Sequence, residues 1–478
     1  MSHQLRSRLN IAIAFLALGV IACTCGNIAN LVATPTPPPL PTSAPLPTVV
    51  NTPAPAPTKP VIGGGEGGGG GIAAGKLQTV NTNVVQRADG TWRLLGEVAN
   101  GTEAAAVNVS LQIEWFDASG QSLGADITYL LTSNIAPGET APFLYNIYDT
   151  GVPLASFTAT VTDFTSSQDL TRAALDLEHA SFTIDDYGDF HCTGELVNNT
   201  NDPVLIESLA AAILDNNRAL FSVDSYWAVV RYLEPGERTP YRISPLGAEG
   251  AVVSDYFCYV YIDAVVAEPV PANAIAFKDT NGDGDNSNDV LYFVDTLGYS
   301  HLVGEVVNNG NEAMNVQLVG GLYDADGNVI DVDFNSIPVP LSPGEALPFD
   351  FTTFSATNYN TALRDGTASF TVQVDPYWTY AAITEYAALE ARNGSATEED
   401  GIITETVDVV NTQTFDVDYA YVIASVTDPS GQVVGYSYAA TDPIPAGATV
   451  KTQITIYVDP ALDPSELKVN LIVKAPKP

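Results

Sequence analysis

Two glutamates recur at fixed spacing along this chain of 478 residues. One lies in a Gly-Glu-Val-x-Asn-like motif, and the other follows in a Pro-Gly-Glu-x-x-Pro motif. A pair of carboxylates is what a glycosidase uses as acid and base or nucleophile. The same pair occurs three times here, whereas an active site needs one asymmetric constellation, so we expect these residues to serve the fold. They are Glu97, Glu195 and Glu305, then Glu139, Glu237 and Glu345.

A dense set of oxygen ligands lies in the acidic segment 279–289. Asp279, Asn281 and Asp283 occupy positions 1, 3 and 5 of an EF-hand-like loop, with Gly284 at position 6. Position 12 is Val290 rather than glutamate, and apolar strand-like runs flank the segment. The sequence therefore leaves two alternatives, a structural Ca²⁺ site or a solvated acidic connector. The candidate ligands are Asp279, Asn281, Asp283, Asp285, Ser287 and Asp289.

Cysteine and histidine offer little further chemistry. Cys192 stands at an apolar core position, and Cys258 alternates with Val260 and Ile262 on a later strand. Two inward cysteines on different strands of one domain favour a disulfide if the protein is exported, and two buried free thiols are the alternative.

His191 and His301 occupy the place that Arg93 has in another repeat, which suggests an exposed strand position. The chain contains no nucleophile elbow and no metal-binding His pair, so we do not expect a hydrolase.

Paired aromatic residues are candidates for sugar recognition. Tyr226-Trp227 and Tyr377-Trp378 could stack on a carbohydrate. Such residues more often fill sandwich cores or the junctions between modules. We therefore keep carbohydrate binding as an alternative function.

The elements that position these residues are four copies of one unit. The two motifs lie 39 or 41 residues apart in three copies, with the strand between them ending in an acidic turn. A fourth copy has Val407 in place of the motif glycine and Ala446-Gly447 in place of Pro-Gly. The repeat length matches one immunoglobulin-like sandwich. Pro-Gly predicts a type II turn, because its second residue must tolerate a positive φ. We interpret the divergent fourth copy as a terminal cap.

The combined motifs resemble the FxLYD-type immunoglobulin-like modules of bacterial surface proteins. The nearest match is Leu322-Tyr323-Asp324-Ala325-Asp326-Gly327, although Gly320 occupies the place of the eponymous Phe. The resemblance covers most of residues 76–476. It implies an extracellular β-sandwich without assigned catalytic residues, and it supplies no ligand.

The N-terminus reads as an export signal. Arg6 and Arg8 precede an apolar run from Ile11 to Ala22, which is too short to span a bilayer as a helix. Val20-Ile21-Ala22-Cys23 resembles the lipobox of bacterial lipoproteins, which implies cleavage before Cys23 and attachment of lipid to its thiol; plain secretory cleavage is the alternative. The following Pro/Thr-rich stretch favours extended polyproline II, and the Gly-rich stretch behind it favours a flexible joint.

Composition limits the partners. The formal net charge is −38 at pH 7, so no basic surface exists to displace the counterions of nucleic acid. Frequent Val, Thr, Tyr and Phe in short runs, broken by Gly, Pro, Asn and Asp, predict an all-β fold.

The sequence therefore predicts four tandem immunoglobulin-like β-sandwich domains behind a signal peptide and disordered linkers. We expect a non-catalytic lipoprotein, anchored on the extracellular face of the cell membrane, that works in surface interaction or spacing. Its partner would be an extracellular protein or glycan, its cofactor structural Ca²⁺. An enzyme with an active site between domains is a further alternative. The predicted parts are the signal peptide 1–22, the linker 23–75, copy one 76–168, copy two 175–268, the acidic connector 269–289, copy three 290–378 and copy four 382–476.

Overall fold

The computed structural model describes residues 75–87, 89–148, 153–168, 172–225, 229–247, 251–270, 274–280 and 289–478. All of them belong to one compact unit of the chain, Ala54–Pro478. The predicted signal peptide and the linker up to residue 74 lie outside the described residues. The same holds for Cys23, Tyr226, Trp227, Asn281, Asp283, Asp285 and Ser287.

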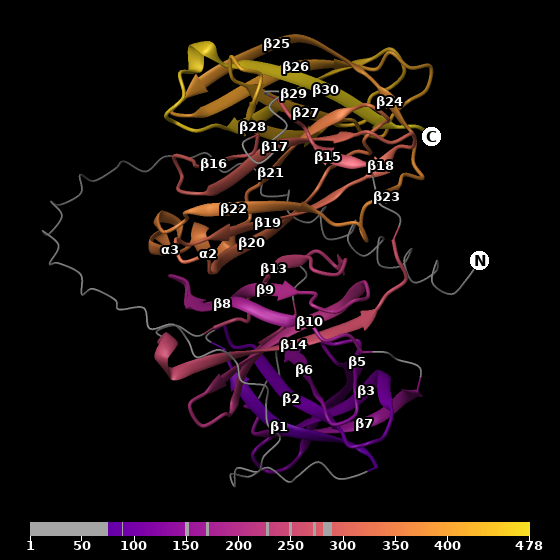
Figure 1. Ribbon diagram of the computed structural model, residues 1–478, viewed down its shortest axis with the longest axis vertical. Helices are drawn as coiled ribbons and strands as arrows, with labels where there is room; N and C mark the ends of the chain where they lie inside the picture. The colour runs from indigo at the N-terminus through magenta and orange to yellow at the C-terminus, as the bar shows by residue number, and fades with distance from the viewer. Residues whose placement is uncertain are drawn as a thin grey trace, which may run out of the picture. The chain divides into compact units, whose positions relative to one another are not determined.

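Strands make up nearly all the regular structure, so the all-β prediction is confirmed (Figure 1). The helices among the described residues are short: α2 (Ser355–Asn358), α3 (Thr361–Asp365) and the 3-10 turns Val253–Asp255 and Pro464–Glu466. In this part of the chain no helix has the length and apolarity needed to cross a membrane. The number of immunoglobulin-like domains stays a prediction.

Copy one contains two antiparallel sheets. The first has the order β1-β2-β6, and the second has the order β4-β3-β5, with β7 also paired to β3. Alternation along β2 and β3 points Leu94, Val98, Leu111 and Ile113 into one core between the sheets. The strands are β1 (Leu77–Gln86), β2 (Trp92–Asn100), β3 (Ala105–Phe116), β4 (Ser122–Tyr129), β5 (Asn134–Ile135), β6 (Thr140–Ile147) and β7 (Ser156–Ser167).

Copy two repeats this layout. Its first sheet has the order β13-β9-β8, and its second has the order β11-β10-β12, with β14 paired to β10. The strands are β8 (Asp176–Ile184), β9 (Phe190–Val197), β10 (Val204–Asp215), β11 (Leu220–Asp224), β12 (Tyr232–Leu233), β13 (Arg238–Ile243) and β14 (Tyr256–Val266).

Copy three has a first sheet β15-β17-β16, with β21 paired to β17, and a second sheet β20-β19-β22; β18 and β23 form a two-stranded ribbon. Its first strand, β15, lies within the predicted connector 269–289. The strands are β15 (Ile275–Phe277), β16 (Leu291–Val294), β17 (Ser300–Asn308), β18 (Met314–Asn315), β19 (Gln317–Tyr323), β20 (Val329–Ser336), β21 (Ala346–Phe351), β22 (Ser369–Val374) and β23 (Tyr380–Ala381).

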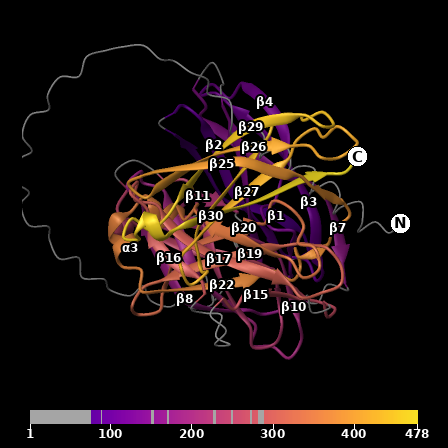
Figure 2. The same ribbon diagram turned by 90° about the horizontal axis from the view of Figure 1, so that it is seen from above.

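Copy four has a first sheet β25-β26-β29, whose strands run side by side in Figure 2, and a second sheet β24-β30-β27-β28. The strands are β24 (Tyr386–Ala388), β25 (Glu390–Glu399), β26 (Ile402–Val410), β27 (Tyr421–Thr427), β28 (Val433–Ala440), β29 (Thr449–Tyr457) and β30 (Lys468–Pro476).

The first-motif glycine and the second-motif aromatic face each other across neighbouring strands. Gly96 pairs with Phe143, and a Cβ on Gly96 would come within 2.4 Å of that ring. Gly194 with Tyr241 and Gly304 with Phe349 repeat the arrangement. In copy four Val407 replaces the glycine, and the residue opposite it is Thr452, which is smaller than an aromatic residue. The two motifs are therefore linked because a large ring needs a residue without a side chain opposite it.

A fully buried asparagine closes the first motif in all four copies. Its Nδ2 donates to the carbonyl four residues on and to a second carbonyl 33 or 35 residues on, while its Oδ1 accepts from the backbone N–H two residues on. The asparagine thus fastens the end of one strand to the loop after it and to a distant strand. The four residues are Asn100, Asn198, Asn308 and Asn411.

Both predicted kinds of turn are present. The Pro-Gly turns carry a positive φ at Gly138, Gly236 and Gly344, and at Gly447 in copy four. This is the backbone that a type II turn requires. The acidic turns are also alike, because each aspartate Oδ1 accepts from the N–H groups two and four residues on. Those residues are Asp117, Asp215, Asp324 and Asp428.

Consecutive copies pack against each other in one repeated way. The outer face of a first sheet contacts the second sheet of the following copy: β2 contacts β10 and β11, β9 contacts β19 and β20, and β17 contacts β28 (Figure 1). Strand β19 is therefore buried on both faces. Leu318 and Leu322 face the core of copy three, whereas Val319 and Tyr323 join the core cluster of copy two. The apolar clusters remain distinct, although four of those in the described part of the chain extend across a joint.

Candidate functional site

The first-motif glutamates of copies one and two lie in the joints between copies. Glu97 Oε1 accepts a 2.6 Å hydrogen bond from the hydroxyl of Tyr261, which belongs to copy two. Glu195 Oε1 accepts a 3.0 Å hydrogen bond from the hydroxyl of Tyr323, which belongs to copy three. Both tyrosines are buried, and burial raises the pKa of Tyr261 well above its ordinary value. These glutamates therefore hold neighbouring copies together.

The second-motif glutamates serve their own turn. In each case one carboxylate oxygen accepts from the backbone N–H three residues earlier, at Ala136, Glu234 and Ser342. Glu345 also accepts a 2.5 Å hydrogen bond from Lys474 of copy four.

Further polar contacts cross the joints below the surface. Asp331 is completely buried and accepts a 2.6 Å hydrogen bond from Arg242 of copy two. Asp263, also completely buried, accepts a 2.6 Å hydrogen bond from Asn134 of copy one and pairs with Arg172. Burial raises the pKa of Asp263, against the opposing effect of Arg172. Removing one partner of such a buried ion pair destabilises a protein by several kcal/mol. These pairs therefore determine which surfaces of neighbouring copies pack together.

Arg93, His191 and His301 are buried, so their predicted exposure is wrong. Each is 3% exposed or less. Arg93 donates to Ser222 and to the carbonyl of Val223 in copy two. The side chain of Arg93 points away from the core of its own sandwich, as the sequence suggested. Copy two covers it.

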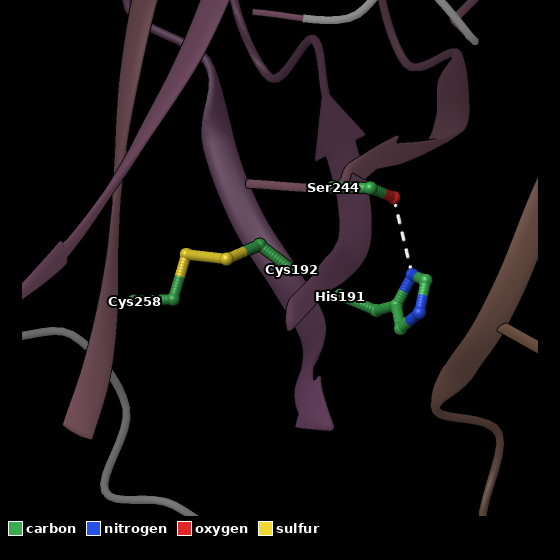
Figure 3. Close-up of a disulfide and its surroundings, with 4 residues drawn as sticks. All are labelled: His191, Cys192, Ser244 and Cys258. Atoms are coloured by element: carbon green, nitrogen blue, oxygen red, sulfur yellow. Dashed lines mark hydrogen bonds between the residues drawn. A yellow bond between two sulfur atoms is a disulfide. The ribbon is translucent and has the colours of Figure 1, made fainter. Parts of the chain in front are cut away.

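His191 belongs to a Ser-His-Asp arrangement that the sequence did not reveal. Its Nδ1 lies 3.1 Å from Ser244 Oγ (Figure 3). Its Nε2 lies 3.1 Å from Asp185 Oδ2. A serine hydrolase has serine on Nε2 and the carboxylate on Nδ1, and His191 holds these two partners the other way round. Ser244 lies 53 residues from His191, so no local sequence signal could have joined them.

The same His-Asp pair recurs in copy three without a serine. His301 Nε2 lies 3.4 Å from Asp295, and its Nδ1 lies 2.8 Å from Asp350. Burial alone lowers the pKa of His301, but the two carboxylates outweigh it and raise that pKa. Burial raises the pKa of Asp350 to about 6. Because the pair repeats and His191 is 1% exposed, we interpret both arrangements as buried polar networks.

Cys192 and Cys258 form a disulfide, as the sequence predicts (Figure 3). The bond joins β9 of the first sheet to β14 of the second, and the two Cα atoms are 6.2 Å apart. It therefore cross-links the two layers of copy two beside His191.

One group of side chains in copy two has the composition of a metal site. Glu178, His179 and Glu195 each offer a ligand atom, and these atoms all lie within 4.8 Å of one another. Arg238 Nη1 lies 2.9 Å from Glu195 and 3.5 Å from Glu178. The sequence gives no sign of this group because His179 and Glu195 stand on different strands, β8 and β9.

Of the predicted Ca²⁺ ligands, Asp279 and Asp289 are described. Asp289 is 6% exposed, and its Oδ1 accepts a 3.0 Å hydrogen bond from the N–H of Thr280, so the two ends of the segment lie together. Its buried Oδ2 has no hydrogen-bond partner among the described residues.

The described aromatic pair Tyr377-Trp378 lies at a joint. The rings meet edge to face at 89°, and the guanidinium of Arg231 from copy two lies 5.0 Å from the Tyr377 ring. A hollow of about 420 Å³ lies elsewhere, lined by Thr296, Leu297, Thr397, Glu398, Glu399, Asp400, Ile402 and Thr404. None of the predicted site residues lines it.

No family model matches the chain, and no curated protein matches it. Similar solved structures include a β-glucuronidase from glycoside hydrolase family 2, with a TM-score of 0.14, 10% identity, and coverage of 72% of this chain and 30% of that chain. The α-2-macroglobulin of E. coli has a TM-score of 0.12, 11% identity, and coverage of 83% and 28%. A Salmonella α-2-macroglobulin mutant has a TM-score of 0.12, 12% identity, and coverage of 84% and 30%. The chain spans less than a third of each of these proteins, and at these scores we draw no conclusion about fold or function.

Proposed function

We propose that this protein is a non-catalytic lipoprotein that displays four immunoglobulin-like copies on the exterior of the cell membrane, for surface interaction or spacing. The observation that carries the proposal is the use of Glu97 and Glu195. A carboxylate repeated in several copies could be taken for a catalytic group. Glu97 and Glu195 instead accept hydrogen bonds from tyrosines of the next copy. A chain built this way presents its copies in a fixed order, which suits reach and repeated weak contacts.

Anchoring through Cys23 is tested by expressing the full chain with Cys23→Ala and following labelled fatty acid. We expect the wild type to carry the label and to sediment with membranes. The variant should lose both properties. A labelled Cys23→Ala protein, or a wild type without lipid, would remove the anchor from the proposal.

The partner is tested by screening the full chain in detergent against glycans, peptidoglycan and extracellular proteins. The exposed ring of Tyr187 in copy two meets the half-exposed ring of Tyr359 in copy three at 77°. Rings arranged edge to face offer a sugar no flat platform, so a protein partner is favoured over a glycan. Glycan binding that disappears in Tyr187→Ala would reverse this preference.

We also propose that the segment 279–289 binds Ca²⁺ as a structural ion. The support is the buried Oδ2 of Asp289, because a buried carboxylate oxygen needs a proton donor or a cation. Calorimetry with Ca²⁺ on the full chain should give heat for the wild type and little for Asp283→Ala. A wild type without heat of binding would leave the solvated connector as the better interpretation.

A further inference from the structure

The shared residues of the copies serve the scaffold, so residues that one copy alone has changed are where an added property is expected. One such place is the β-bulge in β1, β8 and β25, which are edge strands of the first sheets of copies one, two and four. The bulge residue has a positive φ of 48° at Asn81, 50° at His179 and 53° at Asn393. In each copy it directly follows the residue that pairs with the first-motif acid or its equivalent.

In copies one and four this pair is a direct hydrogen bond. Asn81 Nδ2 donates to Glu97 at 2.9 Å, and Asn393 Nδ2 donates to Asp408 at 2.8 Å. In copy two, His179 Nε2 stops 4.0 Å from Glu195 Oε2, which is too far for a hydrogen bond. His179 therefore occupies the bulge position of the asparagine but does not make the asparagine's hydrogen bond to the acid.

Copy two has also changed the residue that pairs with this acid. The cross-strand neighbour is Val80 opposite Glu97 in copy one and Arg392 opposite Asp408 in copy four. In copy three, Lys278 forms an ion pair with Glu305. In copy two the neighbour of Glu195 is another acid, Glu178. Two carboxylates facing each other repel, so this strand pair gains stability from a cation between them.

We propose that the exposed His179, the half-buried Glu178 and the buried Glu195 form a site for a divalent transition metal such as Zn²⁺. One imidazole nitrogen and two carboxylates, with water in the fourth place, are a ligand set that Zn²⁺ takes. Ligand atoms around a tetrahedral ion stand about 3.4 Å apart. The 4.0 Å separation of His179 and Glu195 therefore needs to close by about 0.6 Å.

Arg238 is the competitor for this position. Its guanidinium bridges Glu178 and Glu195, and its side chain is half exposed, so it can turn into solvent when an ion binds. The two carboxylates then face the double positive charge of the metal ion in place of the single charge of the Arg238 guanidinium. The other oxygen of Glu195 keeps its hydrogen bond to Tyr323, so the ion would bind directly behind the joint between copies two and three.

The test is titration of the full chain in detergent with ZnCl₂, followed by calorimetry in the presence of millimolar Ca²⁺. Calcium occupies sites made of oxygen alone, including any in the segment 279–289, and leaves an imidazole site open. The matched variant is His179→Asn, because Asn is the residue that copies one and four hold at this bulge. We expect one Zn²⁺ per chain in the wild type and at least tenfold weaker binding in His179→Asn.

Arg238→Gln should tighten Zn²⁺ binding, because it removes the competing cation. Thermal melting of each variant without metal shows whether it has folded. The proposal is overturned if the wild type binds no Zn²⁺ in Ca²⁺, or if folded His179→Asn binds it with the affinity and stoichiometry of the wild type. If His179→Asn does not fold, Zn²⁺ binding is measured on Glu178→Val, which has the same cross-strand pair as Val80 and Glu97 in copy one. Binding to folded Glu178→Val with the affinity and stoichiometry of the wild type would likewise overturn the proposal.

Discussion

Replacing Asn198 by alanine should destabilise copy two far more than replacing its neighbour Asn199. Asn198 is fully buried, and its side chain makes the hydrogen bonds that recur in all four copies. Asn199 is exposed and donates one hydrogen bond to Asp176 on the surface. The two adjacent asparagines therefore form a matched pair that differs in burial.

The magnitude follows from the groups that Asn198→Ala leaves behind. The carbonyl of Leu233 loses its donor at a residue that is 1% exposed, and such a buried group costs about 1–3 kcal/mol. The carbonyl of Asp202 and the N–H of Thr200 lie nearer solvent. Hydrogen bonds to water therefore compensate in part for the hydrogen bonds to Asn198 that these two groups lose. We expect a total of about 2–4 kcal/mol. For Asn199→Ala we expect a change within about 0.5 kcal/mol.

The assay is denaturant unfolding of the full chain in detergent, with hydrogen exchange to assign the transition to residues 175–268. The exchange data are needed because a chain with several cores need not unfold in one step. Asn198→Ala should lower the midpoint for this segment, while Asn199→Ala should match the wild type. Equal midpoints for the two variants would refute the structural importance of the repeated asparagine.

Three further predictions concern the joints, the disulfide and pH. Tyr261→Phe should weaken the joint between copies one and two by about 1–2 kcal/mol, because it removes only the hydrogen bond to Glu97; a double-mutant cycle with Glu97→Gln measures the coupling. Replacing Cys192 by alanine should destabilise copy two by about 3–4 kcal/mol in thermal unfolding, because it opens a loop with a sequence separation of 66 that ends at Cys258. Because burial raises the pKa of Asp350 from 3.8 to about 6, the folded state takes up a proton more readily than the unfolded state. The free energy of unfolding of copy three should therefore fall as pH rises from about 4 to 6, and Asp350→Asn should flatten that dependence in denaturant titrations at several pH values.

Much of the scaffold could be predicted from the sequence because its signals are local. Pro-Gly at a turn needs a positive φ at glycine, and the structure has it at Gly138, Gly236 and Gly344. The aspartate that ends a strand accepts from nearby backbone N–H groups, so its pattern is visible within a few residues. The disulfide followed from two inward positions on different strands.

The contacts between copies could not be predicted in this way. Exchange of Arg93 for His191 in the next copy looks like surface variation, because the residue points out of its own sandwich. The following copy covers that face, and no spacing rule shows which distant strand does so. The partners of the repeated acids Glu97 and Glu195, Tyr261 and Tyr323, lie 164 and 128 residues away.

The central claim is that one sandwich plan was copied in tandem and that each copy closes with its own asparagine. Hydrogen exchange on the four single variants Asn100→Ala, Asn198→Ala, Asn308→Ala and Asn411→Ala tests it most directly. The account predicts that each variant loses protection in its own copy and at the adjoining joint, while the remaining copies keep theirs. Uniform loss of protection across residues 76–476 in every variant, or no loss in any of them, would contradict it.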